Sequence, residues 1–181
     1  MADREATRHE AGLRAFAFLA AGLILAGCGS GRPRVVREGG SVGSFRIDAT
    51  TEREVRAELG SPDRLDTKLD RAVTAPHGGR MLHYRCGRGC DTVYSFNNDT
   101  GALSDFETQS SDFVTARGSR VGMSAAKAAE LERRRVHAGC GGDQIAIRLD
   151  AHHAYVLGVD AGKVVGITYL GPHSVYYDGL C

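Results

Sequence analysis

The stretch that most constrains the fold is VYSFNNDTGALSDF, residues 93–106. Apolar and polar residues alternate on both sides of a polar segment that contains Gly101, and this pattern predicts two antiparallel strands joined by a turn. A similar stretch, AYVLGVDAGKVVGI, occupies residues 154–167 and aligns Gly162 with Gly101. The same strand–turn–strand unit is therefore predicted twice.

A helix is predicted upstream of each of these units. TTEREVRAELGSPDR, residues 50–64, offers Thr50 or Thr51 as a helix N-cap and the breaker Gly-Ser-Pro as a stop. In the second half, GMSAAKAAELERR contains Ser124 at the matching N-cap position. We therefore expect an α+β fold of two tandem helix-then-antiparallel-sheet repeats, over residues 45–116 and 117–181.

These segments resemble a known family. Residues 50–64, followed by an aromatic strand, a turn with Gly and a final apolar strand, look like the SmpA/OmlA fold of small outer-membrane-assembly lipoproteins. The β-lactamase-inhibitor protein carries a similar fold in tandem, with disulfides. The resemblance implies helices packed on one face of a curved sheet whose other face is free to bind protein. The second half departs from it, because LERRRVHAGCGG lacks the Leu-Gly-x-Pro stop.

The N-terminus has the features of an export signal. AFAFLAAGLILAG, residues 15–27, contains 13 residues without a charge and follows several arginines. It is shorter than the roughly 20 residues that cross a bilayer, but it has the length of a signal-peptide core. A buried core helix is the alternative, although no polar stripe is present to face water. We therefore predict a signal peptide over residues 1–27.

Cys28 follows this apolar run in the order Leu-Ala-Gly-Cys, which resembles the lipobox of bacterial lipoproteins. The resemblance implies a thioether to diacylglycerol on the Cys28 sulfur and cleavage after Gly27, and two acyl chains suffice for stable anchoring. Gly29 in place of Asp would favour the outer membrane where two membranes exist. Residues 28–44 are rich in Gly, Ser, Pro and Arg and are predicted to form a flexible tether.

Four cysteines remain once Cys28 is assigned to lipid, and an even number in an exported chain indicates disulfides. Sequence alone leaves three pairings open, but the strand-like residues around Gly87-Arg88-Gly89 predict a hairpin that favours Cys86 with Cys90. Cys140 would then pair with Cys181. A zinc site of four thiolates is disfavoured, because it lacks a second closely spaced pair of cysteines.

No constellation of residues indicates catalysis. Asp150 could share a face with His152, but adjacent histidines on a strand point to opposite faces, and two ligands do not make a metal site. The Gly-x-Ser-x-Gly match around Ser41 falls in the predicted tether and lacks a strand-to-helix turn. The run ERRR at residues 132–135 is most simply a solvated helix face, and a weak candidate for acidic partners or lipid. We expect no enzyme, cofactor or metal.

The overall composition limits the classes of function that remain. The 181 residues carry a net charge of +1, from 23 basic and 22 acidic residues, which gives no overall attraction to nucleic acid. Several tyrosines could contribute to an exposed binding face or pack in the core: Tyr155, Tyr169, Tyr176 and Tyr177. We expect a non-enzymatic protein-binding lipoprotein, lipid-anchored on the extracytoplasmic side of the cell membrane or the outer membrane. The alternatives are a structural lipoprotein of envelope assembly, or an inhibitor of an extracytoplasmic enzyme.

Overall fold

The computed structural model describes residues 33–67, 79–139, 142–172 and 174. These residues belong to one compact unit that begins at residue 32. The predicted signal peptide, Cys28, Cys140, Cys181, Tyr176 and Tyr177 lie outside the described residues. Within the described ranges, no helix is long and apolar enough to span a membrane.

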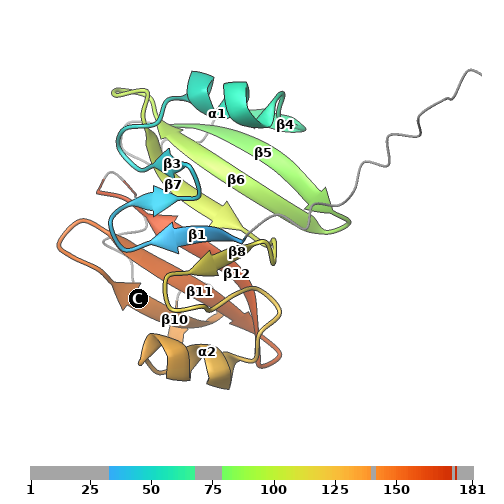
Figure 1. Ribbon diagram of the computed structural model, residues 1–181, viewed down its shortest axis with the longest axis vertical. Helices are drawn as coiled ribbons and strands as arrows, with labels where there is room; N and C mark the ends of the chain where they lie inside the picture. The colour runs from blue at the N-terminus through green and yellow to red at the C-terminus, as the bar shows by residue number, and fades with distance from the viewer. Residues whose placement is uncertain (1–32, 68–78, 140–141, 173, 175–181) are drawn as a thin grey trace, which may run out of the picture. The chain divides into compact units, whose positions relative to one another are not determined.

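An antiparallel sheet of eight strands dominates the described part of the chain (Figure 1). Strands from the two halves meet in its middle, where residues 105–108 of one half pair with residues 167–170 of the other. In spatial order the strands are β4 (Arg64–Asp66), β5 (Gly79–Gly87), β6 (Cys90–Asn97), β7 (Leu103–Thr108), β12 (Lys163–Leu170), β11 (Ala154–Asp160), β10 (Gly142–Arg148) and β9 (His137–Gly139).

A second sheet of four short strands and two helices complete the described structure. Three strands come from the N-terminal residues and one from the middle of the chain, with which the first strand pairs in parallel. In spatial order the strands are β3 (Phe45–Arg46), β2 (Ser41–Val42), β1 (Arg34–Arg37) and β8 (Phe113–Thr115), and the helices are α1 (Glu52–Leu59) and α2 (Ala125–Glu132).

The predicted α+β fold class is wrong, because the protein is mostly β. Strands account for 52% of the described residues and helices for 12%. Both helices have only eight residues, below the length at which a helix is stable alone. α1 buries a single residue, Val55. The chain therefore forms one large sheet and one small sheet rather than two helix-then-sheet repeats, and strands of both halves pair within the large sheet.

The helix caps are where the sequence places them. Thr51 caps α1, and its side chain and that of Glu54 form a capping box. Ser124 caps α2 by accepting a hydrogen bond from the backbone N–H of Lys127. Thr50, the other candidate for the first cap, instead accepts a hydrogen bond from the backbone N–H of Arg46.

The predicted tether over residues 28–44 is wrong for the residues that the structure describes. β1 pairs with both β2 and β8, and Val36 and Val42 are fully buried. Ser41 is a strand residue, so the Gly-x-Ser-x-Gly match belongs to the fold. Apolar side chains in a glycine-rich setting supply part of the core, and any flexible tether must end before Arg34.

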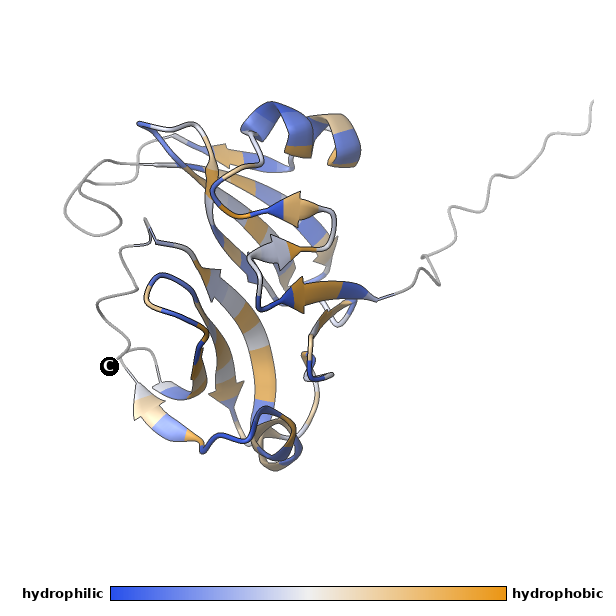
Figure 2. Ribbon diagram, turned by 60° about the vertical axis from the view of Figure 1, so that its left-hand side comes forward, coloured by the Kyte–Doolittle hydropathy of each residue, from blue (hydrophilic) through white to orange (hydrophobic). Residues whose placement is uncertain are grey.

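The core lies between the two sheets. A row of mostly aromatic residues crosses six strands in register: Leu82, Tyr94, Phe106, Tyr169, Tyr155 and Ile147. Phe45 of the small sheet packs edge-on against Tyr94, with ring centroids 5.4 Å apart, and Phe113 packs against Phe106 at 4.9 Å. Figure 2 shows hydrophobic residues along the strands and a mostly hydrophilic α1. Tyr155 and Tyr169 are therefore core residues and form no exposed binding face.

Candidate ligand-binding pocket

A pocket of about 270 Å³ opens beside the C-terminal end of α2. Four segments that are distant in sequence contribute to it: the residue after β1, the turn after β8, the end of α2 with the residues that follow it, and the end of β10. Among the described residues, its charged lining comprises four arginines and two glutamates, and its apolar lining two aliphatic residues. These are Arg117, Arg133, Arg134 and Arg148; Glu38 and Glu132; and Ile147 and Leu149.

The end of α2 sets the positions of two of the arginines. Arg133 adopts the left-handed conformation, with φ of 54°, and thereby terminates the helix. Its backbone N–H donates to the carbonyl of Glu130 at 3.2 Å, and that of Arg134 donates to the carbonyl of Ala129 at 3.0 Å. The chain therefore turns away from the helix axis with Arg133 and Arg134 at fixed positions beside the pocket.

Glu132 forms a buried link between α2 and both sheets. Its side chain is fully buried and accepts hydrogen bonds from the hydroxyls of Thr115, at 2.6 Å, and Tyr155, at 2.5 Å. Burial raises the pKa of Tyr155 above its usual value, and the hydrogen bond to Glu132 raises it further. A buried carboxylate with two hydroxyl donors fixes the end of α2 on β8 and β11.

Arg117 lies between the two glutamates of the pocket. Its Nε is 3.8 Å from Oε2 of Glu132, and its Nη2 is 3.5 Å from Oε1 of Glu38. Among the described lining residues, the arginines outnumber the glutamates by two. Because the lining is strongly basic and only partly open to solvent, the pocket is suited to an anionic ligand.

A second polar cluster surrounds His83, a buried residue of β5. Its Nε2 lies 3.0 Å from Oδ2 of Asp66, and its Nδ1 lies 3.0 Å from Oδ2 of Asp91. Arg64 Nη2 is 3.0 Å from both ring nitrogens. Both carboxylate contacts are hydrogen bonds only when both ring nitrogens carry protons. The imidazole links β4 to β6, so we interpret the cluster as a structural cross-link.

Two carboxyl groups on β7, the strand next to β6, have altered pKa values. Burial raises the pKa of Asp105 to about 6, against the opposing effect of hydrogen bonds from Ser174 and Ser104. Burial also raises the pKa of Glu107, while the nearby His83 lowers it. These two groups keep their protons to higher pH than ordinary carboxyl groups do.

The residues considered for metal binding form a turn instead. Asp150 accepts hydrogen bonds from the backbone N–H groups of His152 and His153, and Oδ2 lies 2.9 Å from Nδ1 of the His153 ring. The backbone hydrogen bond from His152 is the main reason that the pKa of Asp150 is lowered. In the described ranges, no group of three or more His, Cys, Asp or Glu side chains is placed to hold a metal ion.

The predicted Cys86–Cys90 disulfide is confirmed, with Cα atoms 5.1 Å apart. Its hairpin differs in detail from the prediction, because Gly87 rather than Cys86 pairs with Cys90 and the register shifts between Arg85 and Gly87. Cys86 thus occupies a bulge. The Cys140–Cys181 pairing and the lipidation of Cys28 stay predictions, since these residues lie outside the described ranges.

The interpretation of residues 132–135 as a solvated helix face is wrong at its first residue. Glu132 is buried, and the next two residues line the pocket. The spacing contained a signal for this: Ala125, Ala128 and Glu132 follow one another at i, i+3 and i+7, and all three are buried. A glutamate on the apolar stripe of a helix indicates a buried partner rather than a solvated face.

No protein-family model and no curated protein sequence matches the chain. Among solved structures, the uncharacterized protein YfeY from Escherichia coli is similar, with a TM-score of 0.50 and 16% identity over 75% of this chain and 98% of that one. This likeness shows a shared fold alone. An extracellular protein containing an SCP domain from Bacillus anthracis aligns with 68% of the chain, at a TM-score of 0.41 and 8% identity. The chain spans 43% of that protein's length.

Proposed function

We propose that the protein is a non-enzymatic, protein-binding lipoprotein of the cell envelope, anchored through lipid on Cys28. The observation that carries this proposal is the short distance in sequence between Cys28 and the fold. β1 begins at Arg34, six residues after the cysteine. Six extended residues reach at most about 20 Å, so lipidation at Cys28 would keep the folded unit close to the membrane surface.

Two further observations support export and protein binding. The Cys86–Cys90 disulfide is typical of an oxidising compartment. Of the described residues, three large hydrophobic side chains are exposed, and two of them lie at opposite edges of the large sheet: Leu65 on β4 and Val136 next to β9. Sheet edges with nearby apolar side chains can bind an extended segment of a partner protein.

The anchor is tested by metabolic labelling with a palmitate analogue. We expect label in the wild-type protein and none in Cys28→Ser, with the wild type in the membrane fraction and the variant released. Label that persists in the Cys28→Ser variant would show that the proposed attachment site is wrong.

Protein binding is tested by photo-crosslinking in cells. A photoreactive residue at position 65 or at position 136 should capture a specific partner reproducibly, and the two edges need not bind the same protein; one at Arg88, on the exposed disulfide hairpin, serves as the control. Reproducible absence of any partner specific to positions 65 and 136 would contradict protein binding. A structural lipoprotein of envelope assembly would then be the better description.

A further inference from the structure

We propose that residues 175–181, the C-terminal tail, pack across the outer face of the large sheet and are held there by a Cys140–Cys181 disulfide. The outer face is the face of this sheet that is turned away from the small sheet. The tail lies outside the described residues, and three observations on its surroundings carry the inference: the make-up of the face, the way the chain leaves β12, and the length of the tail. This docking goes beyond the proposed protein-binding function and requires neither the lipid anchor nor a partner.

The helices and the small sheet all contact the inner face of the large sheet. Tyr84 donates a hydrogen bond to the carbonyl of Gly60 at the end of α1, and Tyr155 donates to Glu132 of α2. Strand alternation places the neighbours of the core residues on the outer face. Within the part of the chain that the structure describes, no helix covers these outward residues. In the second half they are small, apolar or uncharged, and half-buried: Ala146, Val156, Gly158, Gly166 and Thr168.

The middle of this outer face is suited to aromatic side chains. Gly158 of β11 and Gly166 of β12 pair across the ladder, which leaves a stretch of backbone without side chains. Val165 lies next to it and is 44% exposed. An aromatic ring that packs over paired glycines shields their backbone and replaces the missing side-chain contacts. The tail supplies two such rings, Tyr176 and Tyr177.

The chain leaves β12 on the outer side of the sheet. Asp105 of β7 points to the outer face, because its neighbour Phe106 points into the core. The Asp105 carboxylate accepts a hydrogen bond from the hydroxyl of Ser174, and the N–H of Ser174 donates to the carbonyl of Gly171 at 3.0 Å. The chain therefore turns back after β12, and the tail begins over β7 on the outer face.

The length of the tail matches the diagonal of this face. Cys140 follows Gly139 of β9, at the opposite corner from Ser174. Four inter-strand spacings and the seven-residue length of β10 separate the corners, which is about 19 Å across the strands, about 20 Å along them, and roughly 28 Å on the diagonal. Seven extended residues span at most about 25 Å, and the two Cα atoms of a disulfide lie about 5.5 Å apart.

This reach leaves the tail one direct path. The inner face is filled by the core, and a path around an edge of the sheet is longer than the diagonal. Cys181 therefore reaches Cys140 by a nearly straight course over Gly158 and Gly166. A tail on this course closes the outer face to other proteins and leaves protein binding to the sheet edges.

The disulfide is formed by oxidation of two thiols. Cys140 and Cys181 together lose two protons and two electrons as their S–S bond forms. A protein disulfide of the exporting compartment accepts them by thiol–disulfide exchange and is itself reduced to two thiols. The Cys86–Cys90 disulfide requires an oxidant of the same class.

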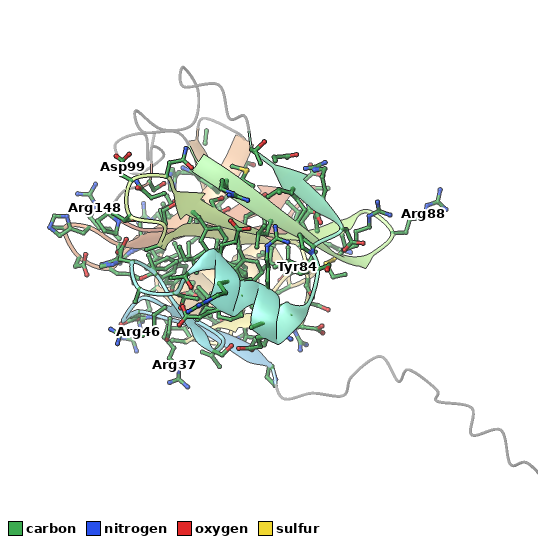
Figure 3. The ribbon with its side chains drawn as sticks, turned by 90° about the horizontal axis from the view of Figure 1, so that it is seen from above. Arg37, Arg46, Tyr84, Arg88, Asp99 and Arg148 are labelled. Carbon is green, nitrogen blue, oxygen red and sulfur yellow. A yellow bond between two sulfur atoms is a disulfide. The ribbon has the colours of Figure 1, made fainter. Side chains whose placement is uncertain are left out.

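The first test is photo-crosslinking within the purified, oxidised full-length protein. A photoreactive residue at position 165 should form cross-links to residues 175–181 of the same molecule, identified by peptide mass spectrometry. Position 88 is the control, because Figure 3 shows Arg88 and Arg148 of β10 at opposite ends of the described fold. Absence of tail cross-links from position 165, or equal cross-linking from position 88, would overturn the proposal. Cross-linked dimers without tail cross-links would overturn it in favour of a second copy.

The second test uses a substitution whose effect has opposite signs on a covered and an uncovered face. A Cβ atom at Gly158 would lie 3.8 Å from its nearest neighbour, Val165, so the described strands accept a side chain there. On an uncovered face Gly158→Thr should raise the melting temperature, because glycine is unfavourable in a strand. Under a docked tail the new side chain displaces the tail, so we expect a fall of about 3 °C or more. A rise would overturn the proposal.

A double-mutant cycle in the full-length protein links this effect to the tail. Tyr176→Ala/Tyr177→Ala alone should lower the melting temperature, but it should cost little more once Gly158→Thr is present, because both changes remove the same contact. Additive effects would overturn the docking.

Peptide mapping without reductant should also link Cys140 to Cys181. Free thiols at both positions would overturn the proposal and would leave the lipid anchor and the protein partner unaffected.

Discussion

Glu132 shows how one residue connects folding to the pocket. Replacing it with Ala leaves the hydroxyls of Thr115 and Tyr155 buried without their acceptor. Each unsatisfied group costs about 1–3 kcal/mol, so we expect Glu132→Ala to lower the free energy of unfolding by about 2–6 kcal/mol. Urea denaturation measures this change.

The control for this prediction is Glu130→Ala on the same helix. The Glu130 side chain is 70% exposed and pairs only with Lys127 among the described residues, so its removal should cost less than about 0.5 kcal/mol. Equal destabilisation by the two variants would show that the buried hydrogen bonds of Glu132 add nothing to the stability of the fold.

The raised pKa of Asp105 predicts how the free energy of unfolding depends on pH. Its pKa is about 6 in the folded protein, compared with 3.8 for a free aspartate. Between these values the folded state holds the proton that the unfolded state has lost, so stability falls as pH rises from about 4 to about 6. The shift corresponds to about 3 kcal/mol, which is lost in full above pH 6.

Asp105→Asn isolates this contribution, because an amide cannot ionise. The variant should lose less stability than the wild type between pH 4 and pH 6.5, as followed by thermal unfolding at a series of pH values. Wild-type and variant curves that run parallel over this range would refute the assignment. Glu107, whose pKa is also raised, is present in both proteins and cancels in the comparison.

At the scale of elements, the disulfide hairpin of β5 and β6 gives the third prediction. By the chain-entropy estimate, closing so short a loop contributes about 2 kcal/mol, so Cys86→Ser/Cys90→Ser should lose about that much stability in urea denaturation. The hairpin is otherwise held by its strand pairing. Unchanged stability would show that the strands alone determine its conformation.

The same double variant tests the predicted Cys140–Cys181 disulfide. A reductant should destabilise it by a further 3–4 kcal/mol or so, because that loop encloses about 40 residues. If reductant has no effect on the variant, the second disulfide does not form. Mass spectrometry of the wild type without reductant provides the direct count of free thiols.

Elements differ in how much of them the sequence reveals. The two hairpins, the caps at Thr51 and Ser124, and the Cys86–Cys90 pair follow from local patterns, and the structure contains all of them. The small sheet could not be predicted in this way. β2 and β3 have two residues each, and β1 pairs with β8, far along the chain. Such pairing depends on distant residues, so local alternation does not indicate it.

The pocket was missed for a related reason. Its arginines are separated in sequence, and only the end of α2 brings two of them together. Read alone, residues 132–135 look like an ordinary charged surface. The burial of Glu132 depends on Tyr155 of β11, and therefore on which face of the sheet that tyrosine occupies. A shift of one residue in the register of β11 would turn the Tyr155 side chain to the other face of the sheet.

At the scale of the whole molecule, the residue at which the fold begins determines how far the folded unit can lie from a membrane to which Cys28 is anchored. Val36 and Val42 are fully buried, and β1 lies between β2 and β8. A chain that starts at residue 32 keeps these contacts, whereas one that starts at residue 45 loses β1, β2 and their part of the core. Burying each valine contributes about 1.5–3 kcal/mol, a large fraction of the stability of a domain this size.

We therefore expect the longer form to unfold cooperatively and the shorter form to lack a cooperative thermal transition by near-ultraviolet circular dichroism. If both forms melt alike, residues 33–44 are dispensable and a long tether is restored; if only the longer one folds, a lipid on Cys28 leaves the folded unit close to the membrane.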